Sequence, residues 1–192
     1  MNKAVFLDRD GVINPLVYNL ATCEYESPNA PEEYSVYPWL LKSLRMLKQR
    51  GFLLFVISNQ PSFAKGKTSL ENIKAIEKLL QGYVEENGCI IDGYYYCYHH
   101  PEGIVPGYGG PCGCRKPGTL FLLKAQDEFD LCFKECYFIG DQDTDIMCGK
   151  AVGMETIKIE NKHSAQKSGR EEPGSYAANL YEAAKIIASK GE

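Results

Sequence analysis

Two aspartates separated by a single residue follow a short apolar run near the start of the chain. The segment FLDRDGVIN, residues 6–14, contains them as Asp8 and Asp10. Two carboxylates at the tip of a buried strand repel each other unless a cation or a shared proton relieves the repulsion. A hard cation such as Mg²⁺ binds oxygen ligands and commonly bridges carboxylates to phosphate. The pair therefore predicts Mg²⁺-assisted chemistry on a phosphorylated small molecule.

The two carboxylates are expected to play different parts in such a reaction. Asp8 would bind the metal and also attack phosphorus, which gives an aspartyl-phosphate. Asp10 would protonate the leaving alkoxide and later activate the hydrolytic water. An acidic pair after a strand is often only a turn, so this interpretation depends on the other polar clusters of the chain.

Further polar clusters follow later apolar runs. These residues are Ser58, Asn59, Gln60 and Asp141. The Ser58 hydroxyl and Asn59 can donate hydrogen bonds to phosphoryl oxygens, and Asp141 can complete the metal site. Lys116, in the segment CRKP, can neutralise charge on pentavalent phosphorus. Each cluster alone could be a turn, a helix cap or a surface charge, but their combination favours phosphoryl transfer.

The motifs DRDG, SNQ, RKP and GDQDTD occur in this order over about residues 3–153. They resemble the motifs of the haloacid-dehalogenase-like phosphatases. The resemblance implies that Asp8 is the nucleophile and Asp10 the acid and base, and that Asp8, the backbone carbonyl of Asp10 and Asp141 hold Mg²⁺. Asp145 matches a second acidic position, either as an outer-shell group or as a helix cap. The substrate-binding residues would be Ser58, Asn59, Gln60, Arg115 and Lys116.

Residues 97–114, CYHHPEGIVPGYGGPCGC, have the composition of a second metal site. The four candidate ligands are Cys97, His99, Cys112 and Cys114. Three thiolates and one imidazole form a tetrahedral zinc set, and four protein ligands indicate a structural ion. Buried free cysteines are the alternative. We predict a structural Zn²⁺ that folds this loop and presents Arg115 and Lys116 to the site.

The zinc loop also resembles that of one group within the superfamily. Twelve residues between His99 and Cys112 match the heptose bisphosphate phosphatases, whereas the related histidinol-phosphate phosphatases have a shorter loop. A heptose 1,7-bisphosphate is therefore the first expected substrate, with histidinol phosphate as the alternative and a non-catalytic zinc-containing binding protein as the alternative from another class. The segment NQPSFAKG, the long stretch 14–37 and the polar stretch after Ile159 depart from the pattern.

The elements that must position these residues alternate between apolar β-rich runs and amphipathic stretches. The predicted strands are Ala4–Leu7, Phe52–Ser58, Gly93–Cys97, Cys136–Gly140 and Met154–Ile159. Apolar stripes at helical spacing lie between them, and a final helix is expected at Tyr176–Ser189. This alternation predicts a doubly wound parallel sheet of the α/β class, Rossmann-like and without a large cap domain. Ligands of such sheets bind at the carboxyl ends of the strands.

Length and charge limit the remaining possibilities. The 192 residues suffice for one domain, residues 1–192, with the zinc loop 97–114 inserted. A net charge of −4 gives no support to a nucleic-acid partner. No apolar run approaches the roughly 20 residues that cross a membrane. We expect a cytoplasmic monomer in which the five cysteines outside the zinc set are free thiols.

Overall fold

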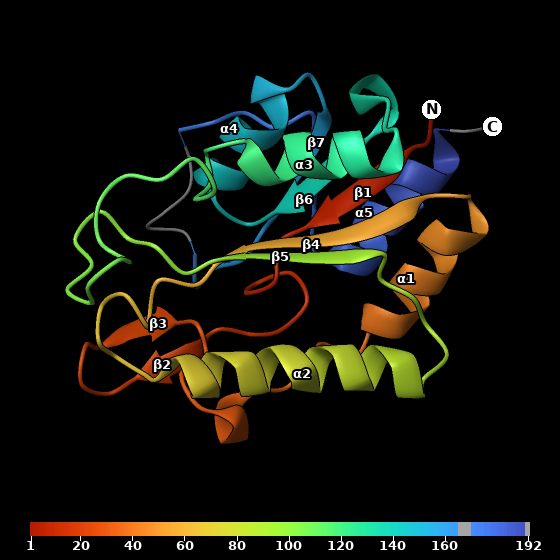
Figure 1. The fold of residues 1–192 in the computed structure, drawn as a ribbon. Coiled ribbons are helices and arrows are strands. Elements are labelled where there is room, and N and C mark those ends of the chain that lie inside the picture. Colours follow the sequence, from red (N-terminus) through yellow and green to blue (C-terminus); the bar gives the residue numbers. More distant parts are fainter. Residues whose placement is uncertain (165–169, 191–192) are drawn as a thin grey trace.

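The computed structural model describes residues 1–164 and 170–190. Its centre is a six-stranded sheet in the order β5-β4-β1-β6-β7-β8, in which every neighbouring pair is parallel (Figure 1). The strands are β1 (Ala4–Leu7), β4 (Leu53–Asn59), β5 (Gly93–Cys97), β6 (Tyr137–Gly140), β7 (Glu155–Ile159) and β8 (Ser175–Ala177). The predicted α/β class is confirmed, and the strand order reverses at β1.

Helices cover both faces of this sheet (Figure 1). They are α1 (Leu40–Gln49), α2 (Leu70–Glu86), α3 (Leu120–Phe129), α4 (Asp143–Ala151) and α5 (Leu180–Ser189), with 3₁₀ turns at Pro31–Glu33 and Phe133–Glu135. Alternate residues of a strand point to opposite faces. Val5 and Leu7 accordingly pack with α1, α2 and α5, whereas Ala4 and Phe6 pack with α3 and α4.

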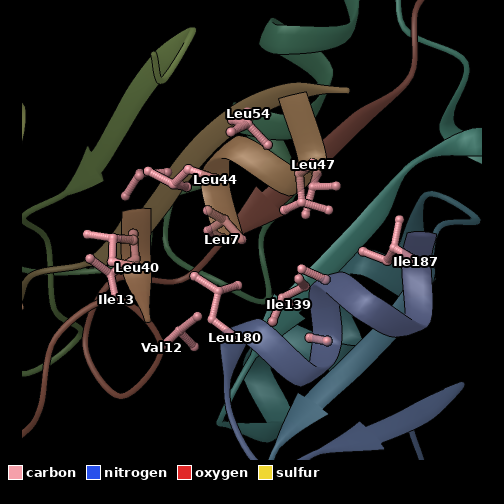
Figure 2. Packing of buried hydrophobic residues seen from close by; sticks show 14 of the residues in the cluster. Leu7, Val12, Ile13, Leu40, Leu44, Leu47, Leu54, Ile139, Leu180 and Ile187 are labelled. Atoms are coloured by element: carbon pink, nitrogen blue, oxygen red, sulfur yellow. The ribbon is translucent and has the colours of Figure 1, made fainter. Parts of the chain in front are cut away.

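One of the predicted apolar stripes lies in the core on the first of these faces. Leu40, Leu44 and Leu47 of α1 are fully buried and lie against Leu7 and Leu54 (Figure 2). Each such side chain contributes roughly 1.5–3 kcal/mol by leaving water. This packing fixes the strands whose ends carry the polar residues.

Two parts of the chain differ from the sequence-based expectation. The stretch 14–37 contains an antiparallel hairpin, β2 (Val17–Asn19) and β3 (Glu24–Glu26), with Tyr18 opposite Tyr25. Such short strands lack the apolar alternation that identifies a strand from sequence. The ring centroids of the two tyrosines lie 5.2 Å apart, and this cross-strand pair stabilises the hairpin.

The C-terminal helix was predicted to begin at Tyr176, and this boundary is wrong. Residues 175–177 form β8, which pairs with β7, and α5 begins at Leu180. Asn179 caps the helix, because its Oδ1 accepts hydrogen bonds from the backbone N–H groups of Tyr181 and Glu182 at 3.0 and 3.1 Å. Part of the polar stretch 160–175, residues 165–169, lies outside the described residues. No helix in the described part of the chain is long and apolar enough to span a membrane.

Candidate active site

The carboxyl ends of three neighbouring strands bring the predicted site residues together. Asp8 follows β1, and its backbone N–H donates to the carbonyl of Ile139 in β6 at 2.9 Å. Ser58 and Asn59 end β4, which pairs with β1 on the other side, and Asp141 follows β6. Polar residues spread over more than 130 positions of the chain therefore share one edge of the sheet.

A tight turn after β1 sets the position of the second aspartate. The carbonyl of Arg9 accepts hydrogen bonds from the N–H groups of Ile13 and Asn14 at 2.8 and 3.1 Å. Gly11 has a φ of +91°, and a Cβ there would lie 2.1 Å from Oδ2 of Asp141. Only glycine fits this close approach of the backbone to Asp141.

Lys116 reaches into the site from the segment that follows the zinc loop. Its buried Nζ lies 2.7 Å from Oδ1 of Asp8 and 2.6 Å from Oδ1 of Asp145, and it donates to the carbonyl of Ile57 at 2.8 Å. Burial lowers the pKa of Lys116, but the charges of Asp145 and Asp8 more than offset it, so this pKa lies above its ordinary value. The amine is therefore a fixed positive charge beside Asp8.

Asn59 and Gln60 were predicted to bind the substrate, and in this structure their side chains contact other residues of the site. Asn59 holds the backbone of Lys116: its Oδ1 accepts from the lysine N–H at 2.9 Å, and its Nδ2 donates to the lysine carbonyl at 3.2 Å. Gln60 donates from Nε2 to Ser58 Oγ at 2.9 Å and to Asp10 Oδ2 at 2.5 Å. In this structure both amides orient other residues of the site.

Asp8, Asp141 and Asp145 form a buried acidic group whose carboxylate oxygens lie within 4.8 Å of one another. Burial, together with the charges of Asp145 and Asp10, raises the pKa of Asp8 to about 7 despite the opposing effect of Lys116. Burial and the charges of Asp8 and Asp145 also hold the pKa of Asp141 well above its ordinary value. Such repulsion is relieved when a cation binds.

This acidic group fits a hard divalent cation. Oδ1 of Asp141 is buried and has no hydrogen-bond partner among the residues that the structure describes. Oδ2 of Asp141 accepts a hydrogen bond from Ser164 and a weaker one, at 3.4 Å, from Asn161. An orphaned carboxylate oxygen beside two further carboxylates is the donor set that Mg²⁺ prefers.

Asp145 is a helix cap, which is one of the two roles that the sequence left open. Its Oδ2 accepts a hydrogen bond from the N–H of Gln142 at 3.0 Å, which caps α4, and its Oδ1 pairs with Lys116. It also belongs to the acidic group. The GDQDTD pattern indicated this residue, but only the folded chain places it beside Lys116.

The side chain of Asp10 lies outside the acidic group and has a different environment. Arg9 forms an ion pair with it at 2.9 Å, and Asn14 donates to its Oδ1 at the same distance. Burial raises the pKa of Asp10, but Arg9 and the hydrogen bonds from Asn14, Gln60 and Ser27 outweigh it, so this pKa lies below its usual range. The sequence analysis did not identify Arg9 as a site residue. The only indication in the sequence was its position between the two aspartates.

The four predicted zinc ligands meet at a single point. The sulfur atoms of Cys97, Cys112 and Cys114 lie 3.1–3.6 Å apart, and Nδ1 of His99 is 3.8 and 3.6 Å from the first and third. Sulfur ligands bound to one zinc at about 2.3 Å would have comparable separations. This cluster fits a tetrahedral zinc ion, and it directly precedes Arg115 and Lys116.

Two of the three segments that depart from the motif pattern, the stretch 14–37 and the stretch after Ile159, meet at the same edge of the sheet. The rings of Tyr25, in β3, and His163 lie 3.6 Å apart. Lys67 pairs with Glu26 of the hairpin at 2.6 Å. Because Ser164 contacts Asp141 and Ser27 hydrogen-bonds Asp10, both segments reach the acidic residues.

Comparison with known proteins agrees with this geometry. A HAD-hydrolase-like family model matches residues 113–183. The D-glycero-beta-D-manno-heptose-1,7-bisphosphate 7-phosphatase of Vibrio cholerae serotype O1 is 31% identical over 153 residues, which are 80% of this chain and 78% of that protein. The enzyme of the same name from Pasteurella multocida is 27% identical over 188 residues, 97% of each chain.

Solved structures show the same fold. The D,D-heptose 1,7-bisphosphate phosphatase of B. bronchiseptica, complexed with magnesium and phosphate, superposes with a TM-score of 0.79 at 21% identity over 99% of each chain. The corresponding protein of Burkholderia thailandensis gives 0.68 at 20% identity over 98% of this chain and 99% of that one. The chain thus belongs to the haloacid-dehalogenase-like phosphatases, as a phosphoric monoester hydrolase related to the heptose 1,7-bisphosphate phosphatases.

Proposed function

We propose that this enzyme hydrolyses a sugar phosphate in a Mg²⁺-dependent reaction that passes through an aspartyl-phosphate. The substrate that this proposal favours is D-glycero-D-manno-heptose 1,7-bisphosphate, whose hydrolysis would give the heptose 1-phosphate. The observation that carries the mechanism is the contact between Lys116 and Asp8 at 2.7 Å inside an acidic group with an orphaned oxygen. A lysine and a metal site on either side of one carboxylate suit attack on a phosphoryl group.

In this proposal Asp8 is the nucleophile and Lys116 stabilises the charge on the transferring phosphoryl oxygens. Asp8, Asp141 and the backbone carbonyl of Asp10 hold Mg²⁺, with Asp145 beside them. The metal supplies charge neutralisation at the phosphoryl group. Ser58 binds a phosphoryl oxygen through its hydroxyl, and Asn59 keeps Lys116 in place through the two hydrogen bonds to its backbone.

Asp10 acts as acid and then as base. The donors around it favour the carboxylate, so it becomes an acid only after it has received a proton. A phosphate monoester, whose second pKa is about 6, enters partly as a monoanion and brings such a proton. Asp10 passes that proton to the leaving oxygen and then, as a carboxylate again, takes one from the attacking water.

A cluster of basic groups supports a substrate with a second phosphate. Burial and the positive charges of Lys65 and Arg115 lower the pKa of His100, and the charge of Glu102 opposes them. Arg115 directly precedes Lys116, and its Nη1 donates to the carbonyl of His99 at 3.3 Å. The planar guanidinium can bind phosphate oxygens in pairs.

The alternative substrate is histidinol phosphate. Its amine would need an acidic or aromatic contact from the segment 14–37, and one of the acidic candidates there, Glu26, already accepts hydrogen bonds from Lys67, Thr22 and Asn19. We further propose that Cys97, His99, Cys112 and Cys114 hold a structural Zn²⁺ that fixes the backbone of Arg115. These contacts favour a bisphosphorylated sugar.

A phosphate-release screen with Mg²⁺ tests the substrate. The panel contains sugar monophosphates, heptose 1,7-bisphosphate and histidinol phosphate. Arg115→Ala should raise KM for the bisphosphate by about tenfold or more and change KM for a monophosphate little, because only the bisphosphate loses a contact. Arg45→Ala, whose guanidinium binds the carbonyl of Asn87, is the matched control. A preference for histidinol phosphate over every sugar bisphosphate would overturn the substrate assignment.

A further inference from the structure

Arg9 lies between the two aspartates and contacts one of them closely. Its side chain is 0% exposed. Nε and Nη2 donate to Oδ1 of Asp10 at 3.1 and 2.9 Å, and Nη2 also reaches Oδ2 at 3.1 Å. From this geometry we propose that Arg9 is a positioning residue, which fixes the carboxylate of Asp10 for proton transfer at the leaving oxygen. The inference rests on the role of Asp10 in the proposed function.

A third side chain closes the arrangement into a ring. Nη2 of Arg9 donates to Oε1 of Gln60 at 2.9 Å, and Nε2 of Gln60 donates to Asp10 and to Ser58 Oγ. Rotation of Asp10 about its side-chain bonds would break contacts to both neighbours. The ring joins the ends of β1 and β4, so it ties the acid to the strand end that carries Ser58.

The position of Arg9 also keeps the two aspartates apart. Whereas Lys116 contacts Asp8, Arg9 lies in the turn after β1 and contacts Asp10 and Gln60. Its charge interacts with Tyr34 and Tyr96, which pack against the core on the α1 and α2 side of the sheet. Arg9 thus draws the side chain of Asp10 out of the acidic group around Asp8.

A contribution to folding stability does not by itself explain why an arginine is buried at position 9. Burial of a guanidinium is costly, and Nη1 of Arg9 has no hydrogen-bond partner in the described part of the chain. Buried ion pairs are often no more stabilising than apolar residues of similar volume. A fixed geometry at Asp10 is what the ion pair provides and an apolar side chain would not.

Single-turnover experiments with two kinds of phosphate ester test the inference. One ester is the sugar phosphate that the wild-type enzyme hydrolyses fastest, whose alkoxide must be protonated as it leaves. The other is p-nitrophenyl phosphate, whose leaving group needs no proton. In Arg9→Lys, release of the sugar should slow by about 10–100-fold, because a misplaced acid loses most of its effect. Release of p-nitrophenol should change by less than about threefold.

The ratio of the two rates is independent of how much of the variant folds, since both esters are measured on one preparation. Arg9→Gln is a second variant, which lacks the positive charge. It should lower the ratio of sugar release to p-nitrophenol release further than Arg9→Lys does. Lys48→Met, which breaks a half-buried ion pair with Asp92 away from the site, is the control and should leave the ratio unchanged.

If the wild type is active and both Arg9 variants keep the wild-type ratio, the inference about Arg9 is overturned and the proposed function is not. A wild type that releases alcohol from no phosphate ester would instead overturn the proposed function, and with it the role of Asp10.

Discussion

Asp8 and Asp10 are separated by one residue, yet their surroundings are opposite. Asp8 lies beside Lys116 in a group of three carboxylates, whereas Asp10 accepts hydrogen bonds from Arg9, Asn14 and Gln60. Two carboxyl groups whose environments differ in this way can take different roles in one reaction. The division of labour proposed for them follows from these contacts.

The two aspartates should therefore respond differently to the same substitution. Asp8→Asn should abolish turnover, because an amide is a poor nucleophile. Asp10→Asn should lower turnover by about 10²–10⁴-fold and let phosphoenzyme accumulate, because only the proton transfers are lost. Phosphate release and acid-quenched phosphoenzyme measure the two effects, with Asp127→Asn as an exposed control. Near-normal turnover in Asp8→Asn would exclude the covalent mechanism.

At the scale of elements, the loop 97–114 has few apolar side chains of its own with which to fold. Its three cysteines and His99 converge on one point, and the next residues are Arg115 and Lys116. A bound metal would contribute its binding free energy to the folding of this segment. The position of Lys116 thus depends on the loop as well as on Asn59.

Loss of one sulfur ligand should disturb this loop and, through it, the site. We expect the wild-type protein to contain about one zinc per chain. Cys112→Ser should lose the zinc, make the loop sensitive to proteolysis and reduce activity by displacing Lys116. Cys23→Ser, which removes an exposed cysteine outside the cluster, should retain both zinc and activity. Absence of zinc from wild-type protein made under reducing, zinc-replete conditions would contradict the prediction.

At the scale of the whole molecule, the acidic group opposes folding when no metal is bound. Asp141 has no cationic side chain as its partner in the described residues, and its pKa in the folded chain lies well above the ordinary value. When the pKa of a carboxyl group is higher in the folded chain than in the unfolded chain, the folded state loses stability as the pH rises from the lower pKa to the higher one. Binding of Mg²⁺ should remove this cost and raise Tm.

Asp141→Asn should separate the destabilisation caused by the Asp141 charge from the stabilisation caused by Mg²⁺ binding. The melting temperature of the metal-free variant should exceed that of wild type, by about 2–4 °C per kcal/mol of relieved repulsion. The difference should be larger at pH 7.5 than at pH 6, because Asp141 is more protonated at the lower pH in the folded wild type. Added Mg²⁺ should raise Tm less in the variant than in wild type. Thermal melts check this, with the exposed Asp127→Asn as control, and a lower Tm for metal-free Asp141→Asn at both pH values would refute it.

The sequence by itself determined where the main strands lie along the chain and which residues stand at their ends. Long apolar runs such as Phe52–Ser58 can only be buried, and parallel strands must place their carboxyl ends at one edge. Asp8, Ser58 and Asp141 could therefore be assigned to a common edge without coordinates. The four residues of the zinc cluster were recognisable because their types and spacing are rare outside metal sites.

Only the tertiary structure decided which side chains pair within that edge. The contacts of Lys116 with Asp145 and of Arg9 with Asp10 and Gln60 depend on backbone turns and side-chain directions, which no sequence periodicity encodes. The hairpin β2–β3 and strand β8 escaped prediction for a related reason. Each has only three residues and is stabilised by partners distant in the chain, such as His163 for Tyr25 and β7 for β8, so local propensity was too weak to reveal them.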